Sequence, residues 1–228
     1  MNAKTVAIVQ ARMGSSRLPG KVLMTLGNKP ILVYLCDRLL KAKTLDRIVV
    51  ATSIDSRDDV IAEECERNSI SLFRGDQLDV LGRYVGAAKR FAADIIVRVT
   101  ADNPFTDPES IDRVVRHIAG TGTDYAIEMT SPVGTTGEAI TWEGLQRLDA
   151  VSDLPRHREH VTLYAKEHPC FLRSAFLDSP HNRPDLSFTV DHPSDLAYVR
   201  RIFEGLPHTN FTLKELIALA DEHAVAAV

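Results

Sequence analysis

Short apolar runs alternate with helix-like segments through the first 120 residues, and this alternation most constrains the fold. Four runs have the length and composition of buried strands, at residues 6–9, 48–52, 71–73 and 95–99. The segments between them predict a helix from residue 30 and helices over 57–68, 79–92 and 108–118, with Asp76 as the cap of the third. A strand–helix rhythm with short connections predicts an α/β fold, in which a mostly parallel central sheet is flanked by helices.

The pattern changes after residue 120, because residues 120–140 are rich in glycine, threonine and proline. We therefore expect a single domain over residues 1–228, with a small insertion at 120–185 that serves substrate binding or dimerisation. The remaining elements that we expect are a helix over 156–165, a strand over 170–177, a strand over 186–190 that returns to the main sheet, and helices over 193–204 and 213–222.

Composition limits the partners and the compartment. The chain has 31 acidic and 27 basic residues, so its net charge of −4 gives no reason to expect a nucleic-acid or membrane partner. No apolar stretch has the length of a transmembrane helix, and the start of the chain does not read as a signal peptide. The three cysteines lack CxxC spacing and are typical of a reducing environment. We therefore expect a cytoplasmic protein.

The segment over residues 10–21 reads Gln-Ala-Arg-Met-Gly-Ser-Ser-Arg-Leu-Pro-Gly-Lys and directly follows the first predicted strand. Glycines allow a backbone to approach phosphate, and Arg12, Arg17 and Lys21 supply positive charge. A Walker A loop is excluded, because five residues separate Gly14 from Gly20 and valine follows Lys21. The dinucleotide fingerprint Gly-x-Gly-x-x-Gly is also absent from this segment. The alternative is a basic surface loop, but the position after the first strand favours binding of a nucleotide phosphate.

Two aspartates follow predicted strands, each just before a proline. Asp102 comes after the strand that ends at residue 99, and Asp191 comes after the strand that ends at residue 190. Ligands of open α/β sheets bind at the carboxyl ends of the strands, so both carboxylates would face the phosphate-binding segment. Mg²⁺ takes oxygen ligands and commonly one or two protein carboxylates. The alternative is that each aspartate caps the helix that follows it.

With these residues, the chain resembles the cytidylyltransferases that make CMP-activated acidic sugars, such as CMP-Kdo synthetase and CMP-sialic acid synthetase. The likeness is greatest to the spore coat polysaccharide biosynthesis protein F type and extends over most of the chain. The segments that carry it are Gln10-Ala11-Arg12 through Arg17-Leu18-Pro19-Gly20-Lys21, Arg74-Gly75-Asp76 with Asp79-Val80-Leu81, Arg98-Val99-Thr100-Ala101-Asp102, Arg158-Glu159-His160-Val161-Thr162 and Asp191-His192-Pro193-Ser194-Asp195.

The resemblance implies a Rossmann-like, GT-A-type nucleotidyltransferase fold, a Mg²⁺ cofactor and a homodimer assembled through the insertion. It implies that Asp102 and Asp191 hold the metal, and that Arg12, Lys21 and Asp102 are the catalytic residues. Two positions depart from the family pattern: Ala101 stands where glycine is common, and Gly82 replaces an acidic residue. The nucleotide-binding residues that it implies are Gln10, Ala11, Arg12, Gly14, Ser15, Ser16, Lys21, Arg74 and Arg98.

The sugar site is less defined by the sequence. Arg156 and Arg158 would bind the carboxylate of an acidic sugar, and Glu138 or His160 would bind its hydroxyl groups. For these four residues the alternative is a solvated helix face or a dimer contact.

The expected reaction joins CMP from CTP to an acidic sugar of the Kdo or nonulosonic type and releases pyrophosphate. Its product would serve the biosynthesis of a polysaccharide, such as that of the spore coat, or of a surface glycan. Three alternatives remain open at this point: a nucleotidyltransferase that uses another nucleoside triphosphate, a GT-A glycosyltransferase, and a non-catalytic nucleotide-binding homologue. The chain lacks the Asp-x-Asp pair typical of such glycosyltransferases.

Overall fold

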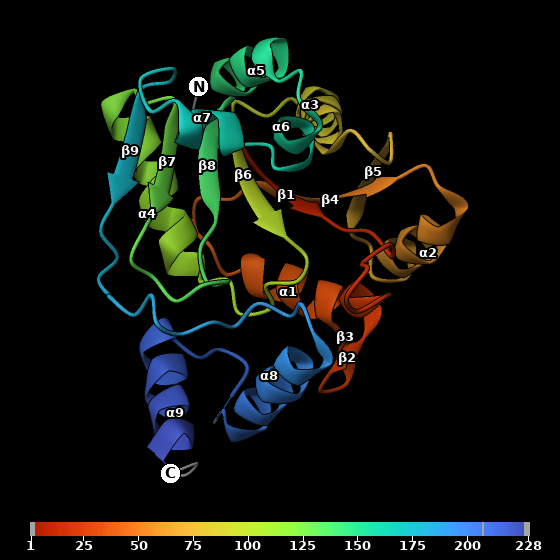
Figure 1. Cartoon of the computed structure of the whole chain (residues 1–228), viewed down its shortest axis with the longest axis vertical. Helices are drawn as coiled ribbons and strands as arrows, with labels where there is room; N and C mark the ends of the chain where they lie inside the picture. The colour runs from red at the N-terminus through yellow and green to blue at the C-terminus, as the bar shows by residue number, and fades with distance from the viewer. Residues whose placement is uncertain (1–2, 207, 226–228) are drawn as a thin grey trace.

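The computed structural model describes residues 3–206 and 208–225, which form a seven-stranded sheet with helices on both faces (Figure 1). The order of strands across the sheet is β5-β4-β1-β6-β8-β7-β9. The strands are β1 (Thr5–Gln10), β4 (Arg47–Ser53), β5 (Ser71–Gly75), β6 (Ile95–Thr100), β7 (Tyr125–Glu128), β8 (Glu138–Thr141) and β9 (Ser174–Leu177), and β2 (Thr25–Leu26) and β3 (Lys29–Pro30) form a separate hairpin.

The helices follow the expected alternation in the first half and cluster near the C-terminus. They are α1 (Ile31–Leu39), α2 (Asp59–Arg67), α3 (Val80–Phe91), α4 (Pro108–Thr121), α5 (Trp142–Val151), α6 (Pro155–Glu159), α7 (Leu163–Glu167), α8 (Pro193–Gly205) and α9 (Leu213–Val225), with short 3-10 helices η1 (Lys21–Leu23) and η2 (Ser56–Asp58).

The four strands of the first half are parallel to one another, as the sequence predicts. β1 is central and pairs with β4 on one side and β6 on the other, so that Val9 lies opposite both Val50 and Val99. Alternate residues of β1 face opposite sides of the sheet: Ala7 and Val9 pack with α1, α2 and α4, whereas Val6 and Ile8 pack with α3 and α5. The mostly parallel α/β fold is therefore confirmed.

The second half of the sheet is mixed, and the sequence did not predict two of its strands. β8 is antiparallel to both β6 and β7, and β7 is parallel to β9. The stretch rich in glycine, threonine and proline therefore contains β7 and β8, four residues each. The predicted helix over 156–165 is divided into α6 and α7, and the predicted strand over 170–177 begins only at Ser174.

The predicted strand over residues 186–190 is wrong. The segment makes one isolated bridge, between Val133 and Ser187, and does not join the main sheet. Its apolar residues Phe188 and Val190 are buried instead in a third hydrophobic cluster with α1, α8 and α9. Figure 1 shows α8 and α9 grouped below the sheet, apart from the helices that cover its faces.

Asp76 is not the cap of α3, contrary to the prediction. The N-cap is Asp79, whose carboxylate accepts a hydrogen bond from the Gly82 N–H at 2.8 Å. Asp76 closes the preceding turn, where it accepts the N–H groups of Leu78 at 2.7 Å and of Asp79 at 3.0 Å. A short carboxylate reaches only two or three residues ahead, so Asp76 cannot reach the N–H groups of α3, which begins at Val80.

Candidate active site

The predicted phosphate-binding segment leaves the carboxyl end of β1 and folds back on Met13. The Met13 carbonyl accepts hydrogen bonds from the N–H groups of Ser15 at 2.9 Å and of Gly20 at 3.0 Å. Gly20 has φ of +72°, a conformation that favours glycine, and it caps η1. The loop thereby places Lys21 at the start of η1, where its side chain points toward the carboxyl end of β6.

Lys21 joins the two predicted metal-binding aspartates. Its Nζ lies 2.6 Å from Asp102 Oδ2 and 2.8 Å from Asp191 Oδ1, and it donates a third hydrogen bond to the Val190 carbonyl at 2.8 Å. The lysine is 7% exposed, whereas both aspartate side chains remain partly open to solvent. One buried ammonium group therefore contacts two carboxylates that are 89 residues apart in the sequence.

Asp191 reaches this position although the segment before it is not a sheet strand. The Val190 N–H donates to the Asp102 carbonyl at 2.9 Å, which holds the segment beside the end of β6. Neither aspartate caps the next helix, because α4 is capped by Asp107 and the N-cap of α8 is His192. The two carboxylates are thus free of the structural role that was their alternative.

The electrostatics keep Asp191 ionised. Partial burial alone would raise its pKa, but the hydrogen bond from Lys21 and the charges of Lys21 and Arg17 lower the pKa below its ordinary value. Arg17 contributes through an ion pair of 2.8 Å between its NH2 atom and Asp191 Oδ1.

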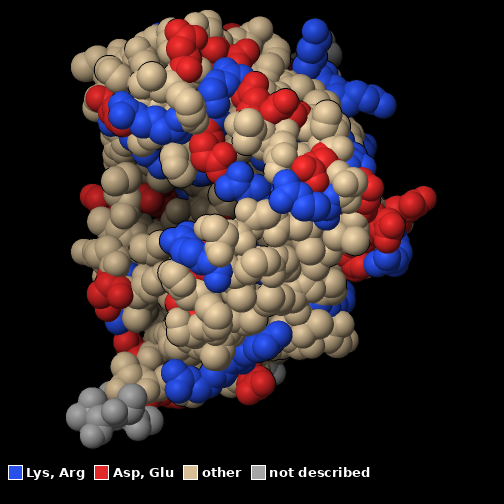
Figure 2. Space-filling model, turned by 45° about the vertical axis from the view of Figure 1, so that its right-hand side comes forward, with Lys and Arg blue, Asp and Glu red and all other residues tan. Residues whose placement is uncertain are grey.

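A cleft of about 280 Å³ contains most of the predicted site. The cleft lies at the carboxyl ends of β1 and β6, contains the predicted phosphate-binding loop, and is lined by Glu159, the last residue of α6. Predicted residues that line it are Gln10, Ala11, Arg12, Gly14, Ser15, Ser16, Lys21, Arg98, Asp102, His160 and Asp191. Its lining combines four basic side chains with three carboxylates, and Figure 2 shows acidic and basic side chains interspersed over one face of the molecule.

The loop also offers backbone donors to this cleft. Within the part of the chain that the structure describes, the N–H groups of Gly14, Ser16 and Arg17 make no hydrogen bond. Free N–H groups next to basic side chains form an anion-binding concavity. These N–H groups lie on the segment for which the sequence predicts phosphate binding, and that role stays a prediction.

Glu159 lines the cleft as well, and sequence reasoning did not assign it a role. Its carboxylate makes a bidentate contact with Arg12, with Arg12 NH2 at 2.7 Å from Oε1 and NH1 at 3.3 Å from Oε2. The signal that would have found it is its place next to His160 in a segment of the family likeness. Arg12 is therefore paired with a carboxylate of the same cleft.

Arg98, which lines the cleft, forms a second, largely buried cluster with Glu138. Arg98 NH1 lies 2.6 Å from Glu138 Oε1 across the β6–β8 pair. Lys166 lies 3.1 Å from the same carboxylate, and the hydroxyl groups of Tyr125 and Thr162 donate to it. Burial alone would raise the pKa of Glu138, but these cations and hydroxyl donors lower it to about 2.

The other residues predicted for the sugar lie on or near α6. His160 lines the cleft. Arg158 is held by two carboxylates, each 2.6 Å away, those of Asp79 and Asp149. The Arg156 side chain is 60% exposed and lies 3.3 Å from Glu167. The structure therefore brings His160 into the cleft and does not place Arg156, Arg158 or Glu138 among its lining residues.

Gly82, which departs from the family pattern, lies in the first turn of α3 and not in the cleft. A Cβ at this position would collide with the carboxylate of Asp79. The glycine therefore accommodates the cap of α3 in this chain.

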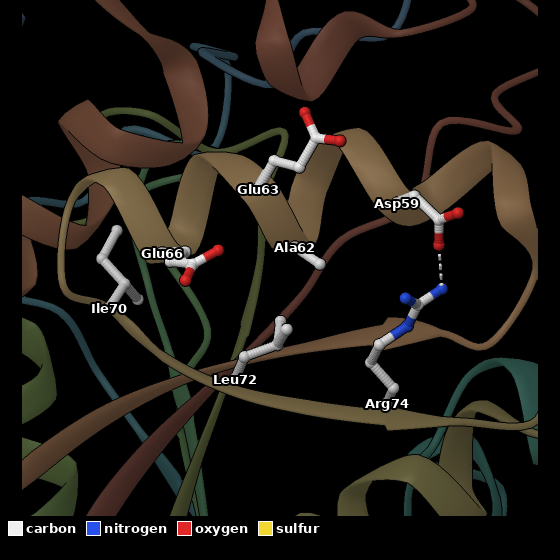
Figure 3. Close-up of a pocket in the computed structure, with 7 residues that line it drawn as sticks. All are labelled: Asp59, Ala62, Glu63, Glu66, Ile70, Leu72 and Arg74. Carbon is white, nitrogen blue, oxygen red and sulfur yellow. Dashed lines mark ion pairs between the residues drawn. The ribbon is translucent and has the colours of Figure 1, made fainter.

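Arg74 lies outside the cleft, in a separate pocket between α2 and β5 (Figure 3). Its NH2 atom is 2.7 Å from Asp59 Oδ1, the contact drawn as a dashed line, and its guanidinium also donates to the carbonyl groups of Ser53 at 2.9 Å and Asp55 at 3.1 Å. The structure does not bring Arg74 to the other predicted nucleotide-binding residues.

The donor set at the end of β6 fits Mg²⁺. Asp102 and Asp191 offer carboxylate oxygens on either side of the Lys21 ammonium. Mg²⁺ commonly uses one or two protein carboxylates together with phosphate oxygens. No group of three or more histidine, cysteine or acidic side chains able to hold a metal occurs among the described residues. A cation here would therefore depend on the bound substrate for its remaining ligands.

Comparison with known proteins agrees with this geometry. A family model described as cytidylyltransferase matches residues 6–222. The chain is 34% identical over 230 residues to the spore coat polysaccharide biosynthesis protein SpsF of Bacillus subtilis, with 96% of this chain and 95% of that protein covered.

Two solved structures share the fold. A cytidylyltransferase from Leptospira borgpetersenii serovar Hardjo-bovis superposes with a TM-score of 0.93 at 29% identity, covering 98% of this chain and 96% of that one. A CMP:2-keto-3-deoxy-manno-octonic acid synthetase complexed with CTP superposes with a TM-score of 0.72 at 18% identity, covering 89% of this chain and 99% of that one.

The described residues contain no helix that is both long enough and apolar enough to cross a membrane. The matched family agrees with the nucleotidyltransferase fold that the structure shows. The chain belongs to the cytidylyltransferase family and is a nucleotidyltransferase.

Proposed function

We propose that the protein transfers CMP from CTP to a hydroxyl group of an acidic sugar of the Kdo or nonulosonic type, with release of pyrophosphate. The observation that carries the proposal is the Lys21 ammonium shared by Asp102 and Asp191 at the mouth of a loop with free N–H groups. That arrangement combines positive charge for a triphosphate with carboxylates for a cation. Binding alone would not need both carboxylates.

In this proposal the loop and its cations hold the triphosphate. The sugar hydroxyl attacks the α-phosphorus and gives up its proton to solvent water, the bond from that phosphorus to the bridging oxygen breaks, and pyrophosphate leaves with the electron pair. Negative charge builds up on the leaving oxygens, so fixed positive charge at Lys21 and Arg12 lowers the barrier. Arg12 becomes available when the triphosphate displaces the carboxylate of Glu159.

Asp102 and Asp191 are the residues that would hold Mg²⁺. When bound, the metal would supply charge that neutralises the phosphates and polarises the attacking hydroxyl. Lys21 would have an additional function, because its ammonium offsets the charges of both carboxylates. The two negative charges would otherwise repel each other across the cleft.

We propose that the sugar lies toward α6. His160 lines the cleft there and would contact sugar hydroxyl groups. Arg156 is the more available partner for the sugar carboxylate, because Arg158 already has two carboxylate partners. Glu138 would contribute by holding Arg98 at the cleft wall, where Arg98 would contact the nucleoside.

We also propose a homodimer formed through residues 120–185, in a cytoplasmic protein. Four large apolar side chains among the described residues of this segment are exposed, and Phe176 lies on the edge strand β9: Met129 at 54%, Val133 at 52%, Leu154 at 49% and Phe176 at 44%. Exposed apolar groups on an edge strand are a surface that favours association. The three cysteines are free, as suits a reducing compartment.

The test is pyrophosphate release with Mg²⁺, for each of the four nucleoside triphosphates against a panel of acidic sugars. We expect release only with CTP and only when a sugar acceptor is present. Release with UTP or GTP would overturn the base assignment. No release with any pair, from a protein that binds CTP, would overturn the proposed acceptor class.

A further inference from the structure

We propose that Asp58 is a positioning residue that sets the phosphate-binding loop for the triphosphate, an inference that rests on the proposed function. No sequence motif singled out this residue, and it does not line the cleft. It is the last residue of η2 and is 3% exposed. It would act through the backbone of Met13.

The two carboxylate oxygens of Asp58 connect β4 with the loop. Oδ1 accepts the Met13 N–H at 2.7 Å. Oδ2 accepts the hydroxyl and the N–H of Ser53, the last residue of β4. A rigid strand of the parallel sheet thus holds the loop at a single backbone group.

Met13 is also the point at which the two limbs of the loop meet. Its carbonyl accepts the N–H groups of Ser15 and Gly20, so the Met13 N–H and C=O are both engaged. The neighbouring N–H groups of Gly14 and Ser16 keep no protein acceptor within the described ranges 3–206 and 208–225. Fixing Met13 therefore fixes the direction of the free donors that would meet phosphate.

A carboxylate suits this position better than a neutral amide. Asp58 receives three donors, and an ionised carboxylate is acceptor-only, with two oxygens. An asparagine would present its NH₂ group either to the Met13 N–H or to the Ser53 N–H. A buried negative charge beside an anion-binding loop also weakens phosphate binding by Coulomb repulsion, so its geometric contribution must outweigh that cost.

The test compares Asp58→Asn with Ser53→Ala, which removes a hydrogen bond to the same carboxylate but leaves the contact with Met13. Binding of CTP is measured by calorimetry without a sugar, together with Tm. For Asp58→Asn we expect the Kd for CTP to rise about tenfold, because the loop N–H groups would no longer point at the phosphate and the hydrogen bonds that they make to it would be weakened. For Ser53→Ala we expect a lower Tm and a Kd within about twofold of the wild type.

An equal Kd for CTP in Asp58→Asn and Ser53→Ala would overturn the positioning role. If Asp58→Asn does not fold, hydrogen exchange of the Met13 amide in the wild type decides instead. We expect that amide to be protected both before and after CTP is added, and exchange at the rate of a free amide would overturn the proposal. A wild-type protein that binds no CTP would contradict the proposed function itself, which is a different outcome.

Discussion

Two charged clusters lie near the carboxyl end of β6 and differ in what their charges can still do. In the open cluster, Lys21 is shared by Asp102 and Asp191, whose side chains are 23% and 30% exposed. In the closed cluster, Glu138 is 6% exposed and is surrounded by Arg98, Lys166 and two hydroxyl donors. Lys21 contacts two carboxylates, of which Asp191 also pairs with Arg17, whereas the single carboxylate of Glu138 contacts two cations.

This difference suits the open cluster to ligand binding and the closed cluster to stabilising the fold. An open cluster with unused carboxylate oxygens can exchange its cation for a ligand without burying a bare charge. A closed cluster cannot, because loss of one partner leaves an uncompensated charge inside the protein. We therefore expect changes in the closed cluster to alter the free energy of unfolding, and changes in the open cluster to alter turnover.

The largest expected effect is on the closed cluster. Glu138→Ala should lower the free energy of unfolding by about 3–5 kcal/mol, because Arg98 is left buried without its carboxylate. Urea unfolding followed by circular dichroism measures this change. Asp37→Ala removes an exposed acidic partner of Lys29 and serves as the control, with an expected loss below about 1 kcal/mol. Equal losses in the two variants would remove the distinction between the clusters.

The pH dependence of stability gives a second view of Glu138. The pKa of Glu138 is lowered from 4.5 to about 2 in the folded protein, so the folded state favours the ionised carboxylate. Its contribution to stability is therefore complete above pH 4.5 and is lost as the pH falls toward 2. Urea midpoints measured from neutral pH down to the folded-state pKa should fall more steeply for the wild type than for Glu138→Gln. Parallel curves would show that the carboxylate is not stabilised by folding.

A substitution in the open cluster should lower the turnover number kcat. Lys21→Ala should lower kcat for pyrophosphate release by about 10²-fold, because the ammonium would stabilise charge on the leaving group. Its Tm should stay within a few degrees of the wild type. Lys29→Ala removes a lysine that is 47% exposed and lies outside the cleft, so it is the matched control. A Lys21 variant of unchanged rate would exclude the lysine from the chemistry.

A Glu159 variant tests whether the ion pair between Arg12 and Glu159, in the same cleft as the open cluster, competes with the nucleotide. Glu159→Gln weakens the internal ion pair with Arg12, so the Kd for CTP should fall about twofold to fivefold, as befits a partly exposed pair. Calorimetry without a sugar measures it. A higher Kd would mean that Glu159 supports the nucleotide site instead of competing with the triphosphate for Arg12.

The smallest effect is expected at Arg74, in the pocket between α2 and β5. Its guanidinium is engaged by Asp59 and two carbonyl groups, so Arg74→Ala should leave the KM for CTP within about twofold. Steady-state kinetics with CTP varied measure it. A tenfold increase in KM would instead support the nucleoside contact that the family resemblance implies.

The parts of the fold that the sequence predicts are those with a local signal. Strands of the parallel half are buried on both faces and therefore read as continuous apolar runs. β7 and β8 are only four residues long and end or begin with the buried acids Glu128 and Glu138, so they resemble loops. The segment over 186–190 has the apolar pattern of a strand, but Phe188 and Val190 pack with helices.

The residues of the candidate site also differ in whether the sequence nearby indicates their role. The phosphate-binding loop is contiguous in the sequence, so its residue types alone indicate its chemistry. Glu159 and Asp58 have their roles only through partners that lie 147 and 45 residues away, Arg12 and Met13. Such pairings depend on how α6 and η2 pack beside β1, which residue spacing does not encode.

The position of Asp191 has a consequence for how the enzyme is made in the cell. The parallel half of the sheet is complete once residue 100 has left the ribosome, and the phosphate-binding loop emerges with it. The second carboxylate is held by a segment anchored on Phe188 and Val190, which need α8 and α9 to bury them. A nascent chain can therefore contain the whole loop over residues 10–21 long before Asp191 is held beside it, and the proposed pair of metal-binding carboxylates would form only in the last quarter of synthesis.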